Sequence, residues 1–422
     1  MLWPVVTRRL PNRSWRKAMC LLCLLIGTST VYSTEAAAPD SDETLYQSAL
    51  DDLGQGNTHQ AIEKLNRLVV RTPMHLGALL DLAIAYCQSD APVKSEVMFD
   101  RLGGYFPQLP PAISELITYY RGTCRSPAPV WRSFVAAGMG HADNLNQSPS
   151  IEYYFLRPFD LTLKLAESAR PRKDNFRAIE AGISRSSQEA GWGGGFFFQE
   201  VDYLHANEYD TRLGQANVSY RHKAGAIHLE AQGIVSHLTL GGESYLTSLS
   251  TNLSAMLPLS SDGHWQFGGI GSLTDLNYLT LSDYRARIVE ARGRLLWQPH
   301  PLLRLQGEIG WNQDTAQGNR PGGNRSGSVA QLTGQVELTG RQFLEFFHRQ
   351  TWVADETAYS QAFFGDEKRR PHQSSWYAAW RYQLPENFQL RLEARYGANR
   401  DTIPLFDYRS SSFGILLEWW PK

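Results

Sequence analysis

The residues of this sequence that could take part in catalysis do not form a recognised catalytic pattern. The run Gly191–Gly195 (GWGGG) is rich in glycine, but it lacks the lysine and the serine or threonine of a phosphate-binding loop. His141, Asp143 and His205 do not have the spacing of a metal site or a catalytic triad. No Gly-x-Ser-x-Gly motif of a hydrolase is present. The sequence therefore predicts no enzyme, no metal and no cofactor, and the glycine run is interpreted as a lipid-facing stretch with room for neighbouring side chains.

Charged side chains instead alternate with apolar ones along several segments in the second half of the chain. Because side chains of a strand point alternately to its two faces, such segments have one charged and one apolar face. Both signs of charge are mixed, so the pattern does not indicate a strongly ion-selective pore. Two interpretations stay open. The charges could form salt bridges that stiffen the inner wall, or they could line a hydrated path for a polar cargo. The candidate inner-wall residues are Arg292, Arg294, Arg304, Glu308, Arg391, Glu393 and Arg395.

The elements that would position these charges are long amphipathic strands. The clearest is 388–396, and 303–311, 289–297 and 227–235 repeat its alternation. Strands of a water-soluble β-sandwich are usually only about 5–6 residues long. The longer ribbons of this sequence are typical of tilted strands that cross a bilayer.

The links between these strands support a transmembrane barrel. Short links alternate with long ones, as short periplasmic turns alternate with longer outer loops in such barrels. Both ends of the barrel must lie in the periplasm, so the strand number must be even. We expect fourteen strands with 143–173 as a long outer loop, or sixteen if that loop adds a hairpin to the wall. The short links lie at 385–386, 339–340, 298–300, 258–262 and 224, and the long ones at 398–407, 354–372, 312–325 and 277–283.

The last predicted strand, 407–420, has a strongly apolar face. Phe413, Ile415, Leu417 and Trp419 share that face, which would be turned to lipid. The spacing of Ser412, Gly414, Leu417 and Trp419 resembles the C-terminal signal that outer-membrane barrels present to their assembly machinery. Lipid and that machinery are therefore expected partners.

The N-terminus has the features of a secretory signal peptide. Five basic residues between Arg8 and Lys17 precede the apolar stretch 19–27, and cleavage is expected between Ser33 and Ala37. Residues 1–36 are assigned to this signal. A net charge of -1 argues against a nucleic-acid partner. The predicted location is the outer membrane of a Gram-negative bacterium.

Residues 41–125 have helical periodicity and are interpreted as a periplasmic domain similar to tetratricopeptide repeats, followed by a barrel over 130–422. Pro73 and Pro107 lie one 34-residue repeat apart. Stacked helix pairs of this kind leave a concave face that can hold a peptide, although the domain could also only brace the barrel entrance. The repeat framework residues are Leu79, Ala83, Tyr86, Phe99 and Pro107.

Two further features concern cysteines and an outer loop. Cys87 and Cys124 fall at nearby heights on neighbouring helices, so we expect a disulfide, with two separate buried thiols as the alternative. The loop 354–373 carries Phe363, Phe364 and the basic run 368–370. It could fold inward as a plug or contact lipopolysaccharide phosphates.

The segment 138–146 (GMGHADNLN) resembles the opening strand of outer-membrane proteins with periplasmic repeats, and most closely the surface lipoprotein assembly modulators (Slam). That resemblance implies a fourteen-stranded barrel that translocates a protein or lipoprotein cargo to the cell surface. The helical domain would receive the cargo in the periplasm. An exopolysaccharide-export porin, whose barrel is often sixteen-stranded, is the alternative, and a diffusion porin with a helical brace is a third.

Overall fold

The structure is a computed structural model that describes residues 41–89, 91–106, 108–124, 130–186, 190–260, 264–300, 302–339 and 341–421. The predicted signal peptide and Pro107 lie outside these residues. Among the described helices, none combines the length and the apolar character that a membrane span needs.

The described N-terminal region forms five helices. Helix α2 begins after Ser41, whose side chain accepts a hydrogen bond from the Thr44 amide. The acidic residues in the first turn of α2 stabilise it through their attraction to the positive end of the helix dipole. Leu65, Leu79 and Phe99 are fully buried in the common core of the helices. The helices are α2 (Asp42–Gly54), α3 (Thr58–Arg71), α4 (Leu76–Gln88), α5 (Pro92–Tyr105) and α6 (Pro111–Cys124).

A disulfide joins α4 to the end of α6 in this helical segment. It links Cys87 to Cys124, whose Cα atoms lie 5.3 Å apart. Of the expected repeat framework, Ala83 is buried, and the buried Tyr86 hydroxyl accepts a hydrogen bond from the Asn66 side chain. Burial raises the pKa of Tyr86 to about 12, so this hydroxyl stays protonated.

The rest of the described chain forms a closed antiparallel barrel of fourteen strands, as expected. Each strand pairs with the next in the chain, and β1 pairs with both β16 and β4 to close the ring. The wall strands are β1 (Val130–Ala142), β4 (Asp174–Ser186), β5 (Gly191–Tyr203), β6 (Thr211–Ala224), β7 (Ile227–Leu240), β8 (Glu243–Pro258), β9 (Trp265–Tyr278), β10 (Ala286–His300), β11 (Leu303–Ala316), β12 (Arg325–Thr339), β13 (Gln342–Asp355), β14 (His372–Gln383), β15 (Phe388–Arg400) and β16 (Tyr408–Trp419).

The two faces of the wall differ as the alternating sequence predicts. Large apolar side chains point outward and are exposed, for example Ile309 at 71% and Met139 at 67%. On β16, Phe413, Ile415, Leu417 and Trp419 are all exposed, whereas inward-facing Glu418 is only 1% exposed. The outside of this barrel is therefore apolar and its inside is polar.

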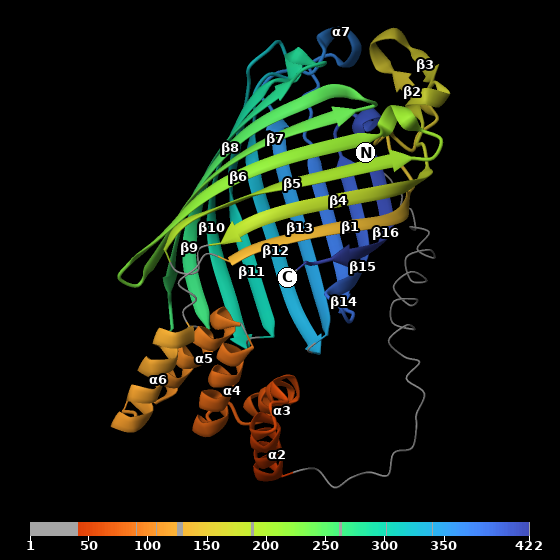
Figure 1. The fold of residues 1–422 in the computed structure, drawn as a ribbon. Coiled ribbons are helices and arrows are strands. Elements are labelled where there is room, and N and C mark those ends of the chain that lie inside the picture. Colours follow the sequence, from red (N-terminus) through yellow and green to blue (C-terminus); the bar gives the residue numbers. More distant parts are fainter. Residues whose placement is uncertain are drawn as a thin grey trace, which may run out of the picture.

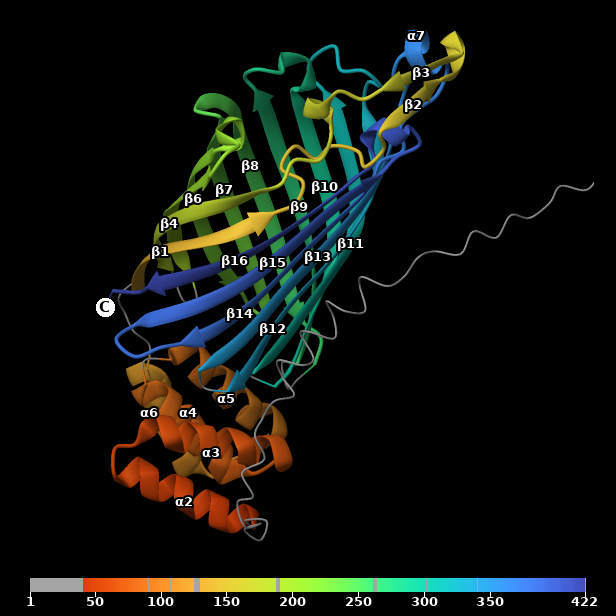
Figure 2. The same cartoon turned by 90° about the vertical axis from the view of Figure 1, so that its right-hand side faces the viewer.

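The helical segment lies at one end of the barrel, which we call the helix end (Figure 1). The start of β1 and the end of β16 lie at this same end (Figures 1 and 2). The longer links gather at the opposite end, which we call the loop end. One link of the loop end is nevertheless a tight turn, because Gly241 and Gly242 both have positive φ and join β7 to β8 directly.

The loop 143–173 forms a small separate sheet at the loop end instead of adding to the wall. Its strands are β2 (Tyr153–Leu156) and β3 (Leu161–Lys164), which pair only with each other. The sixteen-strand alternative is therefore wrong. The short helix α7 (Gln361–Phe364) packs beside this sheet, with the rings of Phe159 and Phe363 6.1 Å apart.

The loop 354–373 does not plug the barrel. Helix α7 lies beyond the strand ends (Figures 1 and 2). Arg369, from the basic run, pairs with Asp401 at 2.8 Å and stacks on Phe406 with 3.6 Å to the ring centre. These contacts hold the loop against its neighbours at the loop end, so the plug interpretation is wrong.

Candidate functional site in the barrel interior and at its helix end

Arg391 of β15 is the centre of an ion-pair cluster on the inner wall. Its guanidinium lies 2.6 Å from Glu180, 2.8 Å from Glu418 and 3.4 Å from Glu393. We call these four residues the seam cluster, because Arg391 reaches Glu180 of β4 across β16 and β1, where the ring closes. All four side chains are nearly buried. A charge network of this kind ties together strands that do not pair with each other.

Small residues beneath the seam cluster allow this close approach. Ala136 of β1 and Leu416 of β16 are buried there and pack with Ala178 of β4. A Cβ atom at Gly138 would collide with the Ile415 carbonyl oxygen and with the Leu416 side chain. Glycine is therefore needed at this position of the seam.

A second group of charges lies on the β10 side of the interior. Glu290 of β10 is contacted by Arg349 of β13 at 2.5 Å, across the two strands between them. Glu308 is contacted by Arg292 at 3.3 Å and by Arg294 at 2.8 Å. We call these five residues the β10 cluster. Like the seam cluster, it connects strands beyond nearest neighbours.

The candidate inner-wall residues do not all join these clusters. Arg395 reaches Glu393 at 3.0 Å at the edge of the seam cluster, with its side chain half exposed. Arg304 of β11 is exposed to the interior, and its guanidinium makes no hydrogen bond or ion pair with any residue that the structure describes. It lines a cavity of about 320 Å³ at the helix end, together with Lys94. Arg304 is therefore an exposed cation at the helix end of the interior.

Strands β5 to β9 face the interior mainly with uncharged polar side chains, which the sequence analysis did not single out. Ser236 lies 2.6 Å from Ser248, Ser250 lies 2.9 Å from Thr274, and Asn252 donates to Gln232 at 3.3 Å. Each of these pairs joins two neighbouring strands. We call this sector the neutral wall. The alternation of Ser and Asn with Leu and Thr along β8, residues 248–254, was the signal that could have revealed it.

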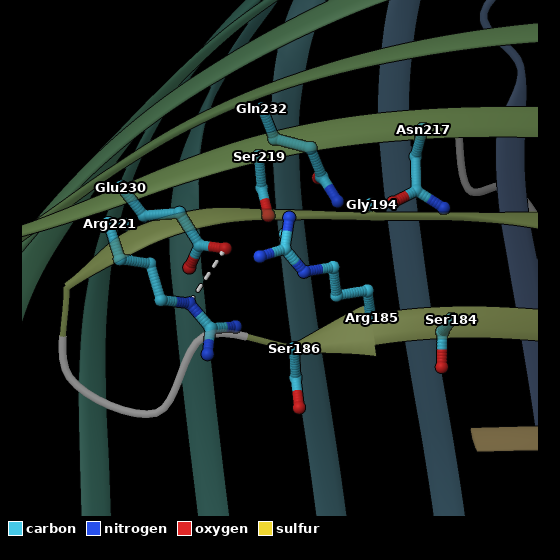
Figure 3. A pocket seen from close by; sticks show the side chains of 11 residues that line it. Ser184, Arg185, Ser186, Gly194, Asn217, Ser219, Arg221, Glu230 and Gln232 are labelled. Atoms are coloured by element: carbon cyan, nitrogen blue, oxygen red, sulfur yellow. Dashed lines mark hydrogen bonds and ion pairs between the residues drawn. The ribbon is translucent and has the colours of Figure 1, made fainter. Parts of the chain in front are cut away.

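The glycine run of β5 borders a small polar pocket of about 150 Å³ (Figure 3). Gly191, Gly193 and Gly194 line it, so the run is not simply a lipid-facing stretch. Arg185 of β4 extends into the space that these glycines leave (Figure 3). Beside it, Arg221 donates to Glu230 at 3.2 Å.

Helix α5 holds the helical segment against the helix end of the barrel. Lys94 forms an ion pair with Glu337 of β12 at 2.8 Å, and Arg101 donates to the carbonyl of Gln298 in β10 at 3.2 Å. The ring of Tyr105 meets His264, before β9, with 6.3 Å between ring centres. These contacts reach three tight turns of the barrel, so the helical segment has a defined position at this opening.

The segment 138–146 has a clear structural role at the loop end. Asp143 accepts hydrogen bonds from the amide of Ser411 at 2.6 Å and from its hydroxyl at 2.5 Å. Asn144 donates to the carbonyl of Arg409 at 2.8 Å, and Asn146 donates to that of Arg170 at 2.8 Å. The motif therefore fastens the end of β1 to β16 and closes the base of the loop 143–173.

The histidines considered for chemistry remain apart. His141 contacts Asn175 at 2.9 Å, and His205 contacts Asp174 at 2.9 Å. No group of three His, Cys, Asp or Glu side chains that could hold a metal exists among the described residues. The barrel interior and its helix end are therefore the site with the strongest functional features.

Comparisons with known proteins concern the fold. No protein-family model matches the chain, and no curated protein matches it by sequence. Solved outer-membrane channels have a similar architecture. The channel DcaP of Acinetobacter baumannii is 8% identical, with a TM-score of 0.38 over 69% of this chain and 97% of that one. A channel of Pseudomonas putida F1 is 12% identical, with a TM-score of 0.36 over 70% and 97%.

Another similar structure is the anion-selective porin of Comamonas acidovorans. It is 8% identical, with a TM-score of 0.35 over 70% of this chain and 99% of that one.

Proposed function

We propose that this protein is an outer-membrane barrel that passes a protein or lipoprotein cargo to the cell surface. The observation that carries the proposal is the position of the helical segment, which α5 fixes at the opening of a closed barrel through Lys94, Arg101 and Tyr105. In this arrangement the helices meet a cargo in the periplasm before it reaches the barrel interior.

The outer surface supports the membrane location. Exposed leucine, isoleucine, valine and aromatic side chains recur on the outward face of strands around the ring, which in water would be unfavourable. A lipid bilayer removes that cost, and a closed ring leaves no unpaired strand edge in it. With the helical segment in the periplasm, the helix end faces inward and the loop end faces the cell exterior.

The strand number supports a protein cargo over a polysaccharide. The resemblance of 138–146 to surface lipoprotein assembly modulators implies a fourteen-stranded barrel, and this ring has fourteen strands. The inner wall offers charged side chains of both signs as well as neutral polar groups. Such a surface suits a hydrated polypeptide of mixed sequence, which itself carries both signs of charge.

A second candidate is export of a polysaccharide. The neutral wall favours it, since Ser, Thr, Asn and Gln side chains exchange hydrogen bonds with hydroxyl groups without preference for charge. The two candidates differ in what a strain without the gene fails to place outside the cell. Loss of surface lipoproteins supports the first, and loss of matrix polysaccharide with normal surface lipoproteins supports the second.

Charge reversal at the docking contact tests the role of the helical segment. Lys94→Glu and Glu337→Lys should each reduce surface lipoprotein display in the complemented strain, because each places like charges together. The double variant restores an ion pair and should restore display. The matched control reverses Lys64 and Asp52, an ion pair of 2.7 Å within the helical segment. Normal display in both single variants, with solute flux through the reconstituted protein also unchanged, would favour a diffusion porin.

A further inference from the structure

Three arginines lie on the outside of the barrel at its loop end. Arg400 ends β15 opposite His372 of β14, and Arg409 of β16 lies opposite Ala398 of β15. Arg370 precedes His372 by two residues, where the chain still bonds with β13 through the Arg369 and Pro371 carbonyls. Successive arginines are thus diagonal neighbours on adjacent strands, with about 7–8 Å between their positions. By alternation they share the outward face of Trp376 and Phe413.

These three guanidinium groups are exposed and have no partner. None makes a hydrogen bond or an ion pair within the part of the chain that the structure describes. Asp407 interacts electrostatically with two of them, Arg400 and Arg409. Its carboxylate already accepts a hydrogen bond from the Asp401 amide at 2.5 Å, and burial raises its pKa. Two of the three cations therefore share one engaged carboxyl group.

Two outward-facing arginines elsewhere near the loop end are different, because they are paired with acids. Arg212 of β6 binds Glu200 at 2.6 Å, and Arg287 of β10 binds Asp275 at 2.7 Å. In the basic run, Lys368 donates to the Glu356 carbonyl at 2.6 Å, and Arg369 is held by Asp401. Arg370, Arg400 and Arg409 therefore lack the side-chain partners that hold Arg212 and Arg287.

A belt of aromatic side chains lies next to the three arginines, toward the apolar part of the outer wall. Trp376 is 49% exposed and stacks with His348 at 3.6 Å between ring centres, and Trp352 stacks with His372 at 5.2 Å. Aromatic girdles mark the level at which the apolar wall of a barrel meets the lipid headgroups. The arginines lie beside and just beyond these rings toward the loop end. Their position therefore corresponds to the phosphate layer of the outer leaflet.

We propose that Arg370, Arg400 and Arg409 form a binding site for the phosphate groups of an outer-leaflet glycolipid, namely lipopolysaccharide. Guanidinium groups bind phosphate through paired charge-assisted hydrogen bonds, and the apolar wall beneath them accommodates the acyl chains. The site rests on the outer-membrane orientation of the proposed function, but it does not depend on the cargo.

Lipid binding to the purified full-length protein tests the site. The probe is bisphosphorylated lipid A in detergent, titrated into the wild type and into the triple variant Arg370→Gln, Arg400→Gln, Arg409→Gln. Because three basic groups near a phosphate layer are removed, affinity should fall roughly hundredfold. The control variant Arg212→Gln, Arg287→Gln should stay within about twofold, because its acids already neutralise those arginines. Unchanged affinity in the triple variant, or an equal loss in the control, overturns the proposal.

Two further arms separate the sources of phosphate and check the fold. Dephosphorylated lipid A should bind the wild type no better than bisphosphorylated lipid A binds the triple variant. If inorganic phosphate alone displaces the lipid at millimolar concentration, the site is a general anion site and the lipid assignment is wrong. Heat-modifiable gel mobility should show a folded triple variant, and Arg400→Lys should keep most of the affinity. Surface lipoprotein display by the triple variant reports separately on the proposed cargo function.

Discussion

The two sectors of the inner wall are built from the same alternating strands, but they are held together differently. In the seam cluster and the β10 cluster, Arg391 and Arg349 each reach a carboxylate across two intervening strands. In the neutral wall, contacts such as Ser250 with Thr274 join only neighbouring strands, which the backbone ladder already joins. The clusters therefore add cross-links that resist bending of the wall, and the neutral wall does not. The charged sector is therefore rigid by construction, and the neutral wall can adapt.

The largest effect is expected where a buried charge loses its partner. Arg391→Met leaves Glu180, Glu393 and Glu418 facing one another, and removing one partner of a buried ion pair costs about 3–5 kcal/mol. Arg221→Met is the matched change within the sector of β5 to β9, where the ion pair with Glu230 joins two neighbouring strands, is exposed and contributes only about 0.2–1 kcal/mol. Urea unfolding in lipid vesicles measures the free energy of unfolding of both variants. Equal losses would remove the distinction between the sectors.

The second prediction concerns the β10 cluster. Arg349→Met removes a charge-assisted hydrogen bond to Glu290, and such bonds contribute about 1.5–3 kcal/mol. The loss is expected to be smaller than for Arg391→Met, because the Arg349 side chain is 27% exposed and its charge is partly solvated. The same unfolding assay should therefore rank the two variants. A reversed order would show that the seam is not the stronger cross-link.

The third prediction uses glycine to compare the closing seam with an open position on the outward face of the wall. At Gly138, an added methyl group collides with the Ile415 backbone across the closing seam, and overpacking of this kind costs about 1–3 kcal/mol. At Gly271 of β9, an added methyl group meets no atom within 4 Å. Gly138→Ala should slow the appearance of the heat-modifiable folded form, whereas Gly271→Ala should fold at the normal rate. Similar folding of both variants would mean that the seam can relax.

A small effect is also expected from the hydrogen bonds of the neutral wall. Ser250→Ala removes one hydrogen bond between half-buried side chains, worth about 0.5–1.5 kcal/mol, and Thr274 remains accessible to water in the barrel. Its unfolding midpoint should lie near that of the wild type. A loss as large as that of Arg391→Met would show that this sector is also tightly cross-linked.

The sequence predicts much of the fold, because alternation in strands is a local property. The long ribbons, the tight turns and the parity of the two ends lead to fourteen strands. The same alternation places Arg292, Glu308 and Arg391 on the inner face. Local patterns also identify the segment 138–146, although they do not reveal that Asp143 binds Ser411.

The partners of these residues could not be predicted, because they depend on distances that the sequence does not contain. Arg391 and Glu180 are 211 positions apart and meet only because the ring closes between them. For the same reason, the alternation did not distinguish Arg304, which has no partner among the described residues, from Arg294, which binds Glu308. Arg369 and Arg370 are adjacent in the sequence, yet only one is neutralised by Asp401.

The connection between the helices and the barrel is short. Its length determines how strong the contact between Lys94 and Glu337 must be to keep the helices at the opening. Cys124 is bonded to Cys87, and only residues 125–129 separate it from β1, a reach of at most about 20 Å. If Lys94 separates from Glu337, the helices therefore stay close to the opening at an effective concentration of about the millimolar range. Contacts that would be too weak to hold two separate proteins together are then sufficient. The helices can therefore leave the opening at low cost and return to it by a unimolecular step.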